Sequence, residues 1–160
     1  MKKQSLLSLK KNLVHPIRTT IAAVLALLLA RLVGLPEVYW APISAIVVME
    51  STLGATLTVS WRRLIGTALG SVAGALLLNH FGPNLLAYAG GILALGLLCA
   101  ILRLEKSAYR FAGVTLTVIL FVSHTNSAWV VAIHRFIEIS AGIVVSLLLT
   151  ALWPEEERMD

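Results

Sequence analysis

Long apolar segments, each close to the length of a membrane-spanning helix, fill most of this chain. A helix that crosses the hydrocarbon of a bilayer needs about 20 predominantly apolar residues, and six such runs can be marked in the 160 residues. Apolar residues make up 58% of the sequence and charged residues 13%, whereas soluble domains carry about 25% charged residues. Because the chain has too few polar side chains to cover itself, a water-soluble enzyme and a disordered chain are excluded.

Charges and turn residues separate the six apolar runs. The predicted spans cover residues 17–35, 39–59, 63–81, 85–104, 108–123 and 129–153. The turn signal Gly82-Pro83-Asn84 separates the third span from the fourth, and Pro154 closes the last. We therefore predict an all-α integral membrane bundle of six transmembrane helices at 17–153, with a basic N-terminal segment at 1–16 and a short tail at 154–160.

The positive residues predict how this bundle is oriented. If the N-terminus is cytoplasmic, 11 of the 13 lysines and arginines fall on the cytoplasmic side, where such residues are enriched. They are Lys2, Lys3, Lys10, Lys11, Arg18, Arg62, Arg63, Arg103, Lys106, Arg110 and Arg158. All four tryptophans fall near predicted span ends, where indole rings anchor helices at the interface. Both signals predict that the two termini are cytoplasmic.

An internal similarity appears when the chain is shifted against itself by 72 residues. The aligned pairs include Arg31 with Arg103, Arg63 with Arg135 and Gly70 with Gly142. Chance is the alternative explanation, since apolar helices produce many coincidences. If the similarity is a true repeat, each half holds three spans and the second half crosses the membrane in the opposite direction. Inverted repeats of this kind are common in secondary transporters, with substrate sites near the midplane.

The densest polar cluster inside a predicted span is His134, Arg135 and Glu138. Spacings of three and four residues allow these side chains to meet on one helix. Charges at membrane depth face a protein interior or a wet cavity and mark functional sites by default. The guanidinium of Arg135 matches a carboxylate, so we take the three residues as candidate substrate contacts. A structural pair between Arg135 and Glu138 is an equally weighted alternative, and the two interpretations are compatible.

Two further charges lie within predicted spans. Glu50 is expected in the middle of the second span and is the candidate proton-coupling carboxylate, although a helix end at this point is the alternative. Arg31 is a further candidate substrate contact. Its position four residues before Leu35 also allows it to extend to the outer surface, which is the interpretation we favour.

Small residues recur at four-residue spacing in two spans. Gly66, Gly70 and Gly74 mark the third span, and Gly142 begins a similar series in the sixth. Such stripes let helix backbones approach closely, so we predict helix-packing positions, with a cavity lined by these residues as a secondary possibility.

Catalytic, nucleotide-binding and metal-binding motifs are absent from the sequence, and Cys99 is its one cysteine. We predict no enzymatic activity, no cofactor, no metal and no nucleic-acid partner. Without a nucleotide-binding domain, transport would have to use an ion gradient or the gradient of the substrate.

Several segments together resemble a known family. They are residues 31–50 (RLVGLPEVYWAPISAIVVME), residues 54–56, residues 63–70 and the His134–Glu138 cluster with Gly142. This pattern resembles the fusaric acid resistance-like family of aromatic acid exporters. The resemblance implies a bacterial inner-membrane protein that exports aromatic carboxylic acids and is driven by the proton gradient. Large family members carry two such modules, so the single module here favours a homodimer, a higher homo-oligomer or a partner subunit.

The sequence thus predicts a transporter that exports small organic anions through the lipid bilayer. A passive organic-anion channel and a non-transporting scaffold subunit are the alternatives.

Overall fold

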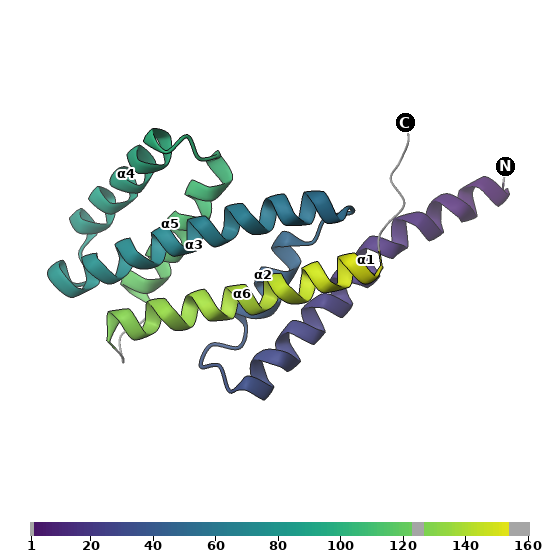
Figure 1. Cartoon of the computed structure of the whole chain (residues 1–160), viewed down its shortest axis with the longest axis horizontal. Helices are drawn as coiled ribbons and strands as arrows, with labels where there is room; N and C mark the ends of the chain where they lie inside the picture. Colours follow the sequence, from purple (N-terminus) through teal and green to yellow (C-terminus); the bar gives the residue numbers. More distant parts are fainter. Residues whose placement is uncertain (1, 123–126, 154–160) are drawn as a thin grey trace. The chain divides into compact units, whose positions relative to one another are not determined.

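The computed structural model describes residues 2–122 and 127–153, with side chains from residue 13 onward, so the predicted tail and most of the last predicted loop lie outside it. Helices are the only regular secondary structure in these ranges, which confirms the all-α prediction (Figure 1). In chain order the helices are α1 (Lys2–Val33), α2 (Trp40–Val48), α3 (Leu53–Phe81), α4 (Leu85–Ile101), α5 (Lys106–Phe121) and α6 (Ala128–Leu152).

Three segments of the described chain are long and apolar enough to cross a membrane: Leu13–Val33, Leu53–Phe81 and Ala128–Leu152. Helix α4 is apolar but has 17 residues, and α5 has 16. By length and composition, therefore, three spans are clear, whereas the sequence predicts six.

The prediction of one continuous helix over residues 39–59 is wrong. Helix α2 has only nine residues, and at 1.5 Å per residue it is about 14 Å long, or half the thickness of the hydrocarbon. It ends because Met49 adopts an extended backbone (φ −67°, ψ 116°). The chain becomes helical again at Leu53, so α3 begins ten residues before the third predicted span.

The chain divides into two compact units, and α3 and α6 each contribute to both. The first unit comprises Met1–Ser60 and Glu138–Asp160, and the second comprises Trp61–Ile137. Helix α1 packs against α2 in the first unit, and α4 packs against α5 in the second.

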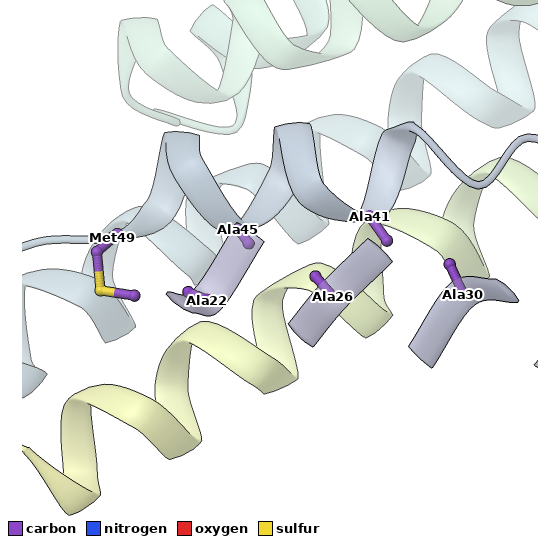
Figure 2. Close-up of a cluster of buried hydrophobic side chains, with 6 residues drawn as sticks. All are labelled: Ala22, Ala26, Ala30, Ala41, Ala45 and Met49. Carbon is purple, nitrogen blue, oxygen red and sulfur yellow. The ribbon is translucent and has the colours of Figure 1, made fainter. Parts of the chain in front are cut away.

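Alanines form the contact between α1 and α2 in the first unit. Figure 2 shows the side chains of Ala41 and Ala45 on α2 beside those of Ala22, Ala26 and Ala30 on α1. All of these alanines are fully buried, and Met49 completes the cluster. Small side chains at four-residue spacing let two helix backbones approach closely.

Larger side chains form the core of the second unit. Leu95 of α4 packs with Ala112 and Leu116 of α5. A neighbouring cluster joins Ala75 and Ile119 to the start of α6.

Helices α1 and α4 end in the same way. A residue with positive φ follows each helix, one position after its end at Gly34 (+73°) and two positions after its end at Arg103 (+53°). In both places the following N–H donates back to a carbonyl five residues earlier, from Leu35 to Ala30 at 3.0 Å and from Leu104 to Cys99 at 2.8 Å. This bond is the signature of a Schellman cap. At these helix ends Arg103 corresponds to Gly34, not to Arg31 as in the 72-residue alignment.

Candidate functional site

One face of α6 presents polar or small residues at every fourth position, and within the first unit it meets α2. These residues are Glu138, Gly142, Ser146 and Thr150, and the three with side chains are at most 1% exposed. Three hydrogen bonds that this face makes with residues 37–49 join residues 101 positions apart. Because the offset is constant, α2 and α6 run in the same direction along their contact.

Two hydroxyl groups and one glycine hold this contact. Ser146 Oγ donates to the carbonyl of Ala45 at 3.0 Å, and Ser44 Oγ donates to the carbonyl of Ile139 at 2.9 Å. Between them, a Cβ placed on Gly142 would overlap the carbonyl oxygen of Ala41 and come within 2.8 Å of Ser44 Cβ. The α2–α6 contact therefore requires a glycine at position 142.

Glu138 begins this polar face and bonds to the residues that precede α2. Its Oε1 accepts a hydrogen bond from the backbone N–H of Glu37 at 2.9 Å. The side chain of Glu37 in turn accepts from Tyr39 Oη and Trp40 Nε1, both at 3.0 Å. Sequence reasoning missed Glu37. Its signal in the sequence was that Tyr39 and Trp40, whose side chains carry hydrogen-bond donors, follow it by two and three positions.

The other predicted substrate contacts differ in burial. Arg135 lies three residues before Glu138 on α6, in the second unit, and is 2% exposed. His134 is half-buried. Arg31 is exposed in the last turn of α1.

Glu50 does not lie in the middle of a span. It follows the end of α2 and precedes α3, because the chain leaves the helical conformation at Met49. Its backbone N–H donates to Thr56 Oγ1 at 3.1 Å, and its side chain is half-buried. The structure thus agrees with the helix-end alternative for this residue.

Arg18 is the largest side chain that is completely buried in the first unit. Its guanidinium donates to the carbonyl of Trp153 at 2.9 Å, and also to the carbonyls of Glu50 and Ser51. These carbonyls follow the C-terminal ends of α6 and α2, where helices present acceptors and a partial negative charge. Sequence reasoning used Arg18 only for orientation. Its signal was the spacing of four residues to Ala22, which places it on the alanine face of α1.

The glycines of α3 meet α5 in the second unit. A Cβ on Gly66 would come within 2.8 Å of Phe111 Cβ, one on Gly70 within 2.9 Å of Thr115 Cβ, and one on Gly74 within 3.0 Å of Ile119 Cβ. Gly66 and Gly70 therefore allow the two backbones to touch, and one turn later Gly74 makes room for the side chain of Ile119.

A buried polar face runs along α3 beside these glycines. Arg63 is 6% exposed, and its guanidinium carbon lies 4.9 Å from the centre of the Phe111 ring, within the range of a cation–π contact. Thr67 and Ser71 follow at four-residue spacing and are 1% and 5% exposed. Neither hydroxyl has a hydrogen-bond partner within the described ranges. Because buried polar groups are normally satisfied, these hydroxyls can accept water or a polar ligand.

In the part of the chain that the structure describes, no group of three or more His, Cys, Asp or Glu side chains could hold a metal ion.

Long apolar helices that bury arginine and glutamate side chains define a membrane protein. The chain belongs to the fusaric acid resistance protein-like family, whose family model matches residues 24–149. This confirms the resemblance that the sequence motifs indicate.

Two curated relatives from Escherichia coli K12 cover nearly the whole chain. The uncharacterized transporter YdhK is 30% identical over 149 residues, which are 88% of this chain and 22% of that protein. The inner membrane protein YeeA is 28% identical over 146 residues, which are 90% of this chain and 42% of that protein. The chain thus spans less than half the length of either relative. No solved structure matches the chain significantly.

Proposed function

We propose that this chain is an inner-membrane transporter that exports small organic anions, with aromatic carboxylic acids as the substrate class. The observation that carries the proposal is the burial of Arg135, which is 2% exposed within a helix long enough to span the bilayer. A charge at this depth is costly and marks a substrate pathway by default. The family and the relative named as a transporter support the same class of function.

In this proposal Arg135 contacts the substrate carboxylate, since its planar guanidinium can donate two parallel hydrogen bonds to it. Glu138 and His134 lie on the same helix within one turn. The Glu138 carboxylate already accepts a hydrogen bond from the N–H of Glu37. A movement of Glu138 when substrate binds at α6 would therefore also move the residues that precede α2. Arg31 is exposed and would act on the substrate only as it enters or leaves.

The polar face of α3 supplies a second group of contacts for an anion. Arg63 contributes a buried cation, and the hydroxyls of Thr67 and Ser71 have no partner within the described ranges. Donors of this kind can replace part of the hydration shell of a carboxylate. We propose that they line part of the substrate path.

Proton coupling is assigned to Glu50. Its half-buried side chain sits at the break between α2 and α3, where Arg18 and Thr56 hold the backbone. A carboxylate at a helix break can exchange protons with water while its backbone stays fixed. Protonation of Glu50 as the anion is released would couple proton entry to anion export.

Two copies of one three-helix repeat are proposed to build the transporter, with α1–α3 corresponding to α4–α6. In support, α1 and α4 have the same C-terminal cap. The glycine contacts are alike as well: Gly142 meets Ala41 and Ser44, and Gly70 meets Ala112 and Thr115. Six crossings and an inverted topology belong to this proposal, as do cytoplasmic termini and a homodimer, a higher homo-oligomer or a complex with a partner subunit.

Flux through purified protein in liposomes tests the proposed function. The substrates are radiolabelled benzoate and salicylate, with succinate as a non-aromatic acid, each measured with and without a pH gradient. We expect Arg135→Ala to lower aromatic acid flux at least tenfold and Arg135→Lys to restore part of it. Arg62→Gln, which removes a surface cation bonded to Glu105, is the matched control.

The remaining variants separate the alternatives. Glu50→Gln should keep downhill flux and lose its response to the pH gradient. If wild-type flux never responds to the gradient, the chain is a passive channel. If the wild-type protein moves none of these acids, the scaffold alternative replaces transport, and full flux through Arg135→Ala would remove Arg135 from the site.

A further inference from the structure

A groove opens on the surface of the second unit between α4 and α5. Its volume is about 290 Å³. Leu93 and Leu97 form its exposed α4 side, and they are 65% and 57% exposed. Tyr109 of α5 lines it as well, and Lys106 lies next to the α4–α5 connection. The groove is thus apolar along α4 and carries an ammonium group at the start of α5.

Gly96 gives the groove part of its depth. A Cβ at this position would lie 3.4 Å from Cε2 of the Tyr109 ring and 3.7 Å from its hydroxyl oxygen, which are ordinary contact distances. The ring therefore lies directly beside the bare backbone of α4. An alanine would fit here, whereas a longer side chain would occupy the groove.

Positive charge gathers near the Lys106 side of the groove. Arg103 precedes α5 and Arg110 lies one turn after Lys106, and all three side chains are exposed. The acidic residue between them, Glu105, is bonded to Arg62. The negative charge of Glu105 is therefore already paired with Arg62, and it does not neutralise the positive charges of Arg103, Lys106 and Arg110.

We propose that this groove binds an anionic phospholipid, with one acyl chain along α4 and the phosphate group on Lys106. This inference rests on the proposed membrane crossing of α4, in which an exposed apolar slot is suited to an acyl chain and a basic cluster at the helix end attracts anionic headgroups. A neutral phospholipid could fill the slot but would gain no net attraction from the cations. The charge complementarity therefore selects an anionic lipid over a zwitterionic one.

Native mass spectrometry of the whole purified chain tests this proposal. The protein is mixed with equal amounts of phosphatidylglycerol and phosphatidylcholine, and the bound lipids are counted. We expect preferential retention of phosphatidylglycerol. Lys106→Gln should lower that retention about fivefold, since a lysine near an anionic headgroup contributes on the order of a fivefold gain in affinity. Lys106→Arg should keep the preference.

Matched substitutions on the same helix test the apolar slot. Gly96→Leu should reduce the retention of phosphatidylglycerol, because the leucine fills the groove. Gly90→Leu is the control on α4, since a Cβ at Gly90 meets nothing within 4 Å. Arg31→Gln controls for the loss of one exposed cation in the first unit.

Three results would overturn the lipid assignment. The first is equal retention of the two lipids by the wild-type chain. The second is retention by Lys106→Gln and Gly96→Leu at the level of their controls. The third is displacement of phosphatidylglycerol by excess benzoate, which would make the groove an entry point for substrate. None of these results depends on transport activity, so a failure here is distinct from a failure of the proposed function.

Discussion

The two units of the molecule make the same kind of helix contact with different side chains. In the first unit Gly142 of α6 lies against Ala41 and Ser44 of α2, and in the second Gly70 of α3 lies against Ala112 and Thr115. In each case the glycine faces a backbone carbonyl and the Cβ of a hydroxyl-bearing residue three positions later. A close approach of two backbones therefore lies at the centre of both units.

The positions that flank the two glycines differ. In the first unit Glu138 and Ser146 form hydrogen bonds to the α2 segment. In the second, Gly66 and Gly74 occupy the corresponding places, where Gly66 faces the carbonyl of Ala108 and Gly74 faces the side chain of Ile119. Close packing in a membrane can use either small residues or hydrogen bonds between helices.

This difference determines which hydroxyl groups take part in helix packing. The first unit uses Ser44, Ser146 and Thr150 to hold helices together. The second unit packs α3 through glycines, and the hydroxyls of Thr67 and Ser71 have no partner within the described ranges. Polar groups that are not used in packing can interact with water or with a polar ligand.

The largest expected effect comes from adding a side chain at either central glycine. Gly142→Val and Gly70→Val should each lower the free energy of unfolding by at least about 3 kcal/mol or prevent folding, because a Cβ there overlaps a carbonyl oxygen. Unfolding in detergent, followed by circular dichroism, measures this loss. Gly90→Val is the control, and a large loss at only one of the two glycines would break the comparison between the units.

A smaller effect is expected from Arg18, which has no counterpart in the contacts described for the second unit. Arg18→Gln should destabilise the protein by about 1–3 kcal/mol, because buried carbonyls at the ends of α2 and α6 lose their donors. The loss of stability in Arg18→Lys should be smaller than in Arg18→Gln, since lysine keeps the positive charge but not the planar guanidinium. Arg62→Gln, which breaks an exposed ion pair, should change stability by less than about 1 kcal/mol. An equal loss in Arg62→Gln would show that any lost cation has this effect.

The smallest effect is expected from making the first unit resemble the second. Ser146→Ala removes the hydrogen bond to Ala45, and such bonds between membrane helices contribute about 0.6 kcal/mol on average. The same unfolding assay should therefore detect a loss of this size. Thr20→Ala is the control, because the Thr20 hydroxyl bonds to Pro16 within its own helix. A loss above about 2 kcal/mol would show that the hydrogen bonds, rather than Gly142, dominate this contact.

Several elements could be predicted from local sequence. The bounds of α4, α5 and α6 lie within three residues of the predicted spans, because apolar runs that end at turn residues define a helix without tertiary information. The stretch from Tyr39 to Val59 could not be divided this way. The polar run Glu50-Ser51-Thr52 after Met49 allowed a helix end only as an alternative, because serine and threonine also occur within membrane helices. The break depends on Arg18 and Thr56, which hold the backbone at Glu50.

The candidate site shows the same limit. Spacing alone placed Arg135 and Glu138 on one helix, and both are buried. It could not reveal that Glu138 bonds to Glu37, because the two residues lie 101 positions apart.

The sequence by itself determined that this chain is helical, that it belongs in a membrane and which family it joins, since these properties follow from composition, apolar run length and short motifs. Only the tertiary structure decided that α2 is a short helix, that Arg18 binds the ends of two helices and that the two units use different side chains for one kind of contact. The physical reason is that a hydrogen bond or a close backbone approach depends on which distant residues face each other, and periodicity along one helix carries no information about its partner.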